Sequence, residues 1–328
     1  MAHQRSLRLA LIALVMPLGI GVTACGSSND SGHTTVPATT RSTTPGTTPG
    51  TTPGTTPDST PTTDTVVHLF AGRPLRRRNG RARWARARRG SSRLTDQAAL
   101  QLEAPVRTAL ADHWRRQGEL EHASIVAFHD LAARLEAVHA PGALVAAAQR
   151  AAHQETDHAQ RCLELAGRYE GLSYTPGRLQ RPLRLPRTRA SELSALAVEA
   201  LRDGVVNEGY AAWVAEQQAA RATDRRVQAT LDVIARDEAD HAELSAEVLA
   251  WCRREGGATV EHALDAAVAA LPARIVAVDV PSGLDTVLLA AHGLSDPDPD
   301  GAGFAHVVAD ALASAGRSPL PHFAAHTA

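Results

Sequence analysis

Apolar residues recur every three to four positions in four stretches of the chain, which is the period of a helix with one buried face. Pro141 and Gly142 separate the first stretch from the second. The segment 171–189, between the second and the third, is rich in Pro and Arg and has no such period. The pattern predicts four helices, at about 104–138, 143–169, 190–221 and 224–254.

The segment 171–189 is unusually long for a loop inside a compact bundle, and it is long enough to run from one end of the bundle to the other. Such a crossover leaves the second and third helices parallel. Weaker helical patterns follow at 260–271 and 305–315. We therefore expect an all-α four-helix bundle over 104–254 with a long crossover, followed by a short helical C-terminal extension over 255–328.

Acidic residues lie on the apolar stripe of all four predicted helices. A Glu and a His three residues apart project from the same face of a helix. This pair occurs in the second and fourth helices, and the first and third carry single glutamates. In the first helix the phase selects Glu121 over Glu119, which lies about 200° around the helix. In chain order, the six residues are Glu121, Glu155, His158, Glu208, Glu238 and His241.

Four glutamates on buried stripes need a common explanation, because burying a carboxylate without a partner is strongly unfavourable. A pair of divalent metal ions supplies one, since four carboxylates balance the charge of two such ions. Without metal, burial and mutual repulsion would raise the pKa values of several of these glutamates. The alternative is an error in helical phase, which would put the six side chains on helix surfaces.

The order Glu, Glu-x-x-His, Glu, Glu-x-x-His resembles that of the ferritin-like di-iron carboxylate superfamily, in particular exported bacterial proteins of this layout, over about residues 104–254. The resemblance implies a ferritin-like four-helix bundle that holds two iron ions. Manganese suits the same ligands and zinc is also accepted. By the resemblance, Glu155 and Glu238 would bridge the two ions. Glu121 and Glu208 would be terminal or bridging ligands. His158 and His241 would each bind one ion.

The resemblance further implies an oxidoreductase that activates O2 or peroxide with an unidentified reductant, in the manner of a ferroxidase, peroxidase or oxidase. Haem is not expected, because Met1 and Met16 are the only methionines and lie in the N-terminal segment. The alternative function is that of a metal-stabilised bundle that catalyses nothing and acts as a binding or structural lipoprotein of the envelope. Dimers are common in the superfamily, so a homodimer is compatible with either function.

Three residues beside the ligand motifs are candidates for contacts that orient the ligands. They are Gln154, Asp237 and Tyr210. The two cysteines of the predicted bundle, Cys162 and Cys252, should lie at opposite ends of antiparallel helices, too far apart for a disulfide. The acidic run that begins at Asp296 is similar to the start of a calcium-binding loop, but position twelve is Val307 rather than Glu, so calcium is not the favoured interpretation.

The N-terminal quarter of the chain is typical of an exported lipoprotein. Residues 1–24 combine a basic start with a short apolar run, and they end in a lipobox-like sequence before Cys25, the predicted site of lipidation. An ordinary signal peptide with an incidental cysteine is the alternative. Residues 25–65 are rich in Thr, Pro and Gly and predict a disordered linker. We expect a lipid anchor on the extracytoplasmic face of the cell envelope, on the outer membrane if the source has two membranes.

The next segment, 66–103, is a basic connector with ten arginines between Arg73 and Arg93. The sequence favours a solvated linker here over a surface that docks on anionic lipid or cell-wall polymer. Nucleic acid is not an expected partner of an exported protein.

Overall fold

The computed structural model describes residues 67–69, 72–77, 80–94, 96–181 and 187–318. The chain divides into two compact units, 1–64 and 65–328, and every described residue belongs to the second. The predicted signal peptide, Cys25 and the linker up to residue 65 lie outside the described residues. None of the helices in the described part of the chain has the length and apolar character that a membrane span requires.

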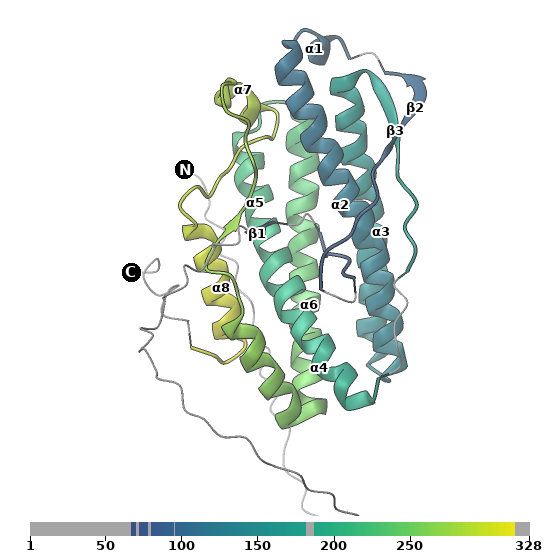
Figure 1. Cartoon of the computed structure of the whole chain (residues 1–328), viewed down its shortest axis with the longest axis vertical. Coiled ribbons are helices and arrows are strands. Elements are labelled where there is room, and N and C mark those ends of the chain that lie inside the picture. The colour runs from purple at the N-terminus through teal and green to yellow at the C-terminus, as the bar shows by residue number, and fades with distance from the viewer. Residues whose placement is uncertain (1–66, 70–71, 78–79, 95, 182–186, 319–328) are drawn as a thin grey trace, which may run out of the picture. The chain divides into compact units, whose positions relative to one another are not determined.

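The described chain is mostly helical, as the sequence predicts. Figure 1 shows the long helices running side by side along the vertical axis, with α8 along the left-hand side. The helix α2 packs along α3, and the α4–η1–α5 segment packs along α6. The helical elements are α1 (Gln97–Leu100), α2 (Ala104–Ala137), α3 (Gly142–Glu170), α4 (Arg189–Glu199), η1 (Ala200–Val206), α5 (Asn207–Arg221), α6 (Arg225–Ala269), α7 (Thr286–Ala291) and α8 (Ala302–Ser314).

Local sequence signals explain where these helices begin and end. Gly171 takes a left-handed conformation, with φ of 78°, at the C-terminus of α3. The Asp224 side chain accepts hydrogen bonds from the first backbone N–H groups of α6. Inside α6, Gly257 has φ 52° and ψ −136°, which breaks the helix into two parts. The break separates the predicted fourth helix from the predicted short helix at 260–271.

The predicted third helix contains a π-helical segment, η1, that the apolar period did not indicate. A π-helical turn holds one extra residue, so it shifts the phase of the residues after it without interrupting the helix. Gly204 lies in this segment, where a Cβ atom would come within 2.1 Å of the Ser245 hydroxyl oxygen of α6. The segment ends one residue before Asn207 and two before Glu208, next to one of the predicted metal ligands.

Short strands join segments that are far apart in sequence. β1 (Val67–His68) pairs in parallel with β4 (Ile275–Val276), and β2 (Arg88–Arg93) pairs antiparallel with β3 (Leu172–Thr175). The expectation of a wholly solvated basic connector is therefore wrong: two of its strands are paired, and Arg73 and Leu75 are only 4% and 2% exposed. The arginines of β2 itself remain on the surface.

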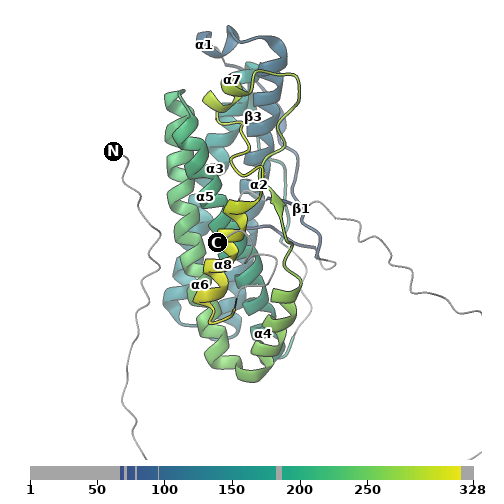
Figure 2. The same cartoon turned by 90° about the vertical axis from the view of Figure 1, so that its left-hand side faces the viewer.

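The C-terminal extension returns along the outside of the helices (Figure 2), and α8 lies against α5. The acidic run ahead of α8 serves this packing. One Asp298 oxygen accepts from the backbone N–H of Gly303 and the other from that of Phe304, and the Tyr210 hydroxyl of α5 donates to Asp298 at 2.7 Å. Asp298 thus binds the first turn of α8, and the calcium-loop interpretation finds no support.

Candidate metal centre

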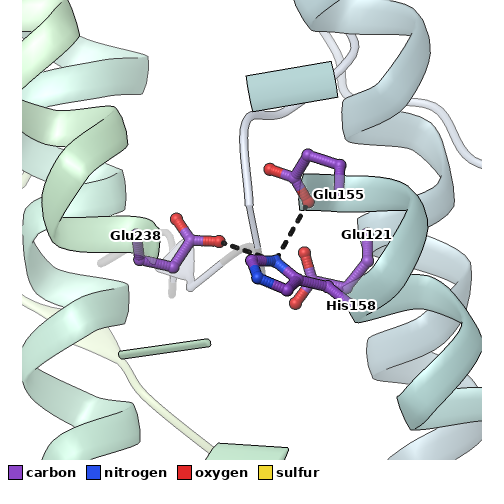
Figure 3. Close-up of side chains that lie close together, drawn as sticks. All are labelled: Glu121, Glu155, His158 and Glu238. Carbon is purple, nitrogen blue, oxygen red and sulfur yellow. Dashed lines mark ion pairs between the residues drawn. The ribbon is translucent and has the colours of Figure 1, made fainter. Parts of the chain in front are cut away.

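The helices bring all six predicted ligand residues into one buried cluster, and two groups of four can be formed from it. One group is Glu121, Glu155, His158 and Glu238; the other is Glu155, Glu208, Glu238 and His241. Within each group, one ligand atom per residue lies within 4.8 Å of the others. Figure 3 shows the first group, in which carboxylate oxygens of Glu155 and Glu238 both face the His158 ring. Glu155 and Glu238 belong to both groups, which is the arrangement that two bridging carboxylates would have.

All six side chains are cut off from solvent, with at most 1% of any of them exposed. Eight of their ligand atoms have no hydrogen-bond partner among the described residues. These atoms are Glu121 Oε2, both oxygens of Glu155 and of Glu238, Glu208 Oε1, and Nδ1 of His158 and of His241. Native proteins leave only a few such atoms per hundred residues, so eight of them in one cluster need an explanation. Carboxylate oxygens and imidazole nitrogens together are the donor set of iron, manganese and zinc, so the cluster fits a metal centre.

Each histidine is oriented by the residue that comes directly before the other Glu-x-x-His motif. His158 Nε2 lies 3.1 Å from a carboxylate oxygen of Asp237, and His241 Nε2 lies 3.1 Å from the amide oxygen of Gln154. Each Nε2–H is therefore donated outward, and each Nδ1 faces the cluster, where it can bind an ion once it carries no proton. His158 Nδ1 lies 3.6 Å from Glu155 and His241 Nδ1 lies 3.5 Å from the other oxygen of that same glutamate. The sequence predicted Asp237 and Gln154 beside the centre, but it did not show that each contacts the histidine of the other motif.

Burial shifts the pKa values of the glutamates strongly. Burial, with repulsion from Glu238, raises the pKa of Glu121 to about 7. Burial raises the pKa of Glu238 and of Glu208 to about 7 as well, the latter despite the opposing charge of Arg73. Burial and the neighbouring glutamates raise the pKa of Glu155 well above its ordinary value. Metal binding to this cluster must therefore displace protons.

The two histidines shift in opposite directions. Burial opposes the charged form of His158, but the bond to Asp237 and the adjacent glutamates outweigh burial and raise its pKa to about 11. Burial lowers the pKa of His241, whose outward partner is the neutral amide of Gln154. The charge of the outward partner is the clearest difference between two otherwise equivalent positions.

The structure also shows where the side chains of Glu119 and Tyr210 lie. Glu119 is buried away from the cluster, where it accepts hydrogen bonds from the Ala87 backbone N–H and from Arg115. Tyr210, the third candidate for a contact that orients a ligand, makes its hydrogen bond elsewhere. Two residues after Glu208 it lies on another face of the helix, where its hydroxyl binds Asp298 and its ring stacks on Trp213.

Three residues at the centre escaped the prediction. Arg73 Nη1 lies 3.6 Å from Glu208 Oε2, and Ser245 donates a hydrogen bond to the same oxygen at 3.2 Å. Gly72 approaches so closely that a Cβ atom on it would lie 2.7 Å from Glu121 and 2.8 Å from Glu155. Ser245 had a signal, since it lies seven residues after Glu238 on the same helix face. Gly72 and Arg73 come from a segment without any period and had none.

A small cavity of about 40 Å³ reaches the cluster at Glu121 and Glu238. Its other walls are mainly apolar and include Trp114, Val214 and Leu231. His113 and Gln117 line both this cavity and a groove of about 670 Å³ on the surface. The cavity has room for a few water-sized molecules, and the shared residues form a wall between it and the groove.

Comparison with models of known protein families, with curated proteins and with solved structures found no match to this chain.

Proposed function

We propose that the chain is a ferritin-like four-helix bundle with a dinuclear metal centre, and that it is an oxidoreductase that reduces peroxide or O2. The observation that supports this most strongly is the set of eight buried ligand atoms without partners, distributed over two groups of four that share Glu155 and Glu238. In the proposal these two glutamates bridge a pair of iron ions, with manganese as the alternative metal. Glu121 and His158 complete one position, and Glu208 and His241 complete the other.

Two Fe(II) ions held there can supply two electrons to one hydrogen peroxide molecule, which takes up two protons and gives two water molecules. The chain itself contributes the geometry. Asp237 and Gln154 fix the imidazoles, and helices on all sides exclude bulk water from the carboxylates. The cavity beside Glu121 and Glu238 has the size of a peroxide or O2 molecule and excludes a bulky organic substrate.

The cellular setting of the proposal rests on the N-terminal sequence. The lipobox-like segment before Cys25 and the Thr/Pro/Gly linker favour a protein tethered to the envelope by a lipid anchor. In that compartment the electrons would come from Fe(II) itself or from a small reductant. A homodimer stays compatible with the proposal.

Metal content tests the proposal first. The full chain, the double variant Glu155→Ala/Glu238→Ala, and an exposed control, Glu136→Ala, are loaded with Fe(II) without oxygen and analysed for bound metal. We expect about two irons per chain in the parent and the control and none in the double variant. The parent should then oxidise Fe(II) with peroxide much faster than the double variant does. A folded parent that binds no metal would overturn the proposal, and a tightly bound metal without turnover would favour the non-catalytic, metal-stabilised bundle.

A further inference from the structure

A cation from outside the four helical segments enters the centre. Arg73 is 4% exposed, and its Nη1 lies 3.6 Å from Glu208 Oε2 and 3.3 Å from the Ser245 hydroxyl oxygen. Ser245 in turn donates to Glu208 Oε2 at 3.2 Å. The same carboxylate oxygen therefore faces both Arg73 and Ser245, whereas Glu208 Oε1 has no partner among the described residues.

The position of Arg73 is fixed by its own segment, residues 72–77, which we call the strap. The Asn207 side chain donates to the Gly72 carbonyl at 3.0 Å. Arg76 makes two hydrogen bonds to the buried Asp203 carboxylate, at 2.8 and 2.6 Å. Leu75 packs into a small apolar cluster with residues of α2. Three kinds of contact thus hold the strap against the helices on both sides of the guanidinium.

The helices leave space for the strap. Gly72 has φ of 60°, a conformation that favours glycine, and side chains of Ser124 and Glu121 occupy the space where its Cβ would be. Gly204, inside the π-helical segment, would place a Cβ within 3.2 Å of Arg73 Nη1. Glycine at these two positions lets the strap pack closely against the helices. The π-helical turn that contains Gly204 is part of this contact.

We propose that Arg73 is a positioning residue of the metal centre that keeps Glu208 a monodentate ligand and offers its unpartnered Nη2 to a small anion. Arg73 and Ser245 hold Oε2, so that Oε1 alone faces the cluster. This inference rests on the proposed metal centre. Glu121, the corresponding residue of the other position, makes no ion pair with an arginine among the described residues, and its Oε2 has no hydrogen-bond partner there.

The class of ligand follows from the guanidinium. Arg73 Nη2 is buried and has no hydrogen-bond partner among the described residues. A buried N–H donor is stabilised by an acceptor, and a charged donor favours an anionic one. The position beside Glu208 therefore suits a small monovalent anion, such as hydroperoxide, formate or azide, rather than a neutral molecule.

The test compares Arg73→Gln with the parent and with Arg77→Gln, the same substitution at an exposed arginine of the strap. Each full chain is loaded with Co(II), whose visible absorption weakens as its coordination number rises, and is then titrated with azide. We expect Arg73→Gln to keep its cobalt but to absorb less strongly, because Glu208 can then bind through both oxygens. Its azide affinity should fall about tenfold to a hundredfold, the range for one charge-assisted hydrogen bond. Arg77→Gln should match the parent.

Two further variants cover a loss of folding in Arg73→Gln. Arg73→Lys keeps the charge and should restore part of the azide affinity. Ser245→Ala removes the second contact to Glu208 Oε2 and should weaken the cobalt absorption in the same direction. If the folded variants at position 73 match the parent in both spectrum and azide affinity, the inference is wrong although the metal centre stands. If the parent binds no cobalt, or if Glu155→Ala/Glu238→Ala binds as much as the parent, the proposed metal centre fails as well.

Discussion

The two halves of the candidate centre use the same ligands at the same spacing and differ in what surrounds them. In one half, His158 is held by the charged Asp237, and Glu121 lies against the backbone of Gly72. In the other half, His241 is held by the neutral Gln154, and Glu208 meets Arg73 and Ser245. The anionic partner and the cationic partner are thus on opposite halves. A repeated motif supplies equivalent ligands, but the residues around it can make the two positions chemically different.

Both halves bury their carboxylates, and pH tests that shared property with the largest expected effect. For an acid whose pKa is higher in the folded state, stability falls as pH rises from the unfolded value, near 4.5, to the folded one. The pKa values of Glu121, Glu208 and Glu238 are all raised to about 7. His158, with its pKa raised to about 11, adds a loss of stability above its ordinary value of 6.5. The lowered pKa of His241 acts in the opposite direction.

We therefore expect the metal-free protein to lose at least about 3 kcal/mol of stability between pH 4.5 and 7.5, the equivalent of one such carboxyl shift. The metal-loaded protein should show the reverse trend, because protons compete with the ions for the same oxygens. Denaturant unfolding of both forms across this range gives the comparison. A metal-free protein whose stability is flat, or rises, over these pH values would show that the carboxylates are not buried together.

The second prediction compares the two halves by substituting Glu121 in one and Glu208 in the other. At pH 8, Glu121→Gln removes a buried negative charge that no arginine faces, so the metal-free protein should become more stable. Glu208→Gln also removes a buried charge but leaves Arg73 without its carboxylate, so its gain should be smaller by about 1 to 3 kcal/mol. Urea unfolding of the two variants without metal measures both effects, with Glu136→Gln as the exposed control. Equal gains in the two variants, or a larger gain in Glu208→Gln, would contradict the difference between the halves.

The helical period was enough to predict that the six candidate residues meet, because each of them lies on a helix face that must be buried. Glu121 was distinguished from Glu119 by phase alone, and the six ligand residues meet as that phase requires. The period could not show the π-helical turn before Glu208, since apolar residues continue at spacings of three to four on both sides of it. It also could not show Arg73, which is one of ten arginines in a segment without a period. Only the three-dimensional contacts distinguish the buried arginine from its solvated neighbours.

The third prediction exchanges the outward partners of the histidines. Asp237→Asn makes the partner of His158 neutral, as Gln154 already is for His241, and should weaken one of the two metal positions about tenfold to a hundredfold. Gln154→Glu gives His241 an anionic partner and should strengthen the other position. Stepwise titration with Co(II) resolves the two affinities, and the combination of both substitutions should reverse their order. Equal affinities in the parent, unaffected by either change, would mean that these partners only orient the rings.

The smallest effect on stability is expected at the face of α5 that contacts the C-terminal extension. Tyr210→Phe removes one hydrogen bond to Asp298, whose oxygens keep the backbone N–H groups of Gly303 and Phe304. The loss should be about 1 kcal/mol of stability, and the affinity for metal should not change. Denaturant unfolding and a Co(II) titration on the same variant give both values. Because Tyr210 follows Glu208 by only two residues, an unchanged metal affinity would show that α5 separates its two roles by face, whereas a loss of metal would couple the extension to the centre through this helix.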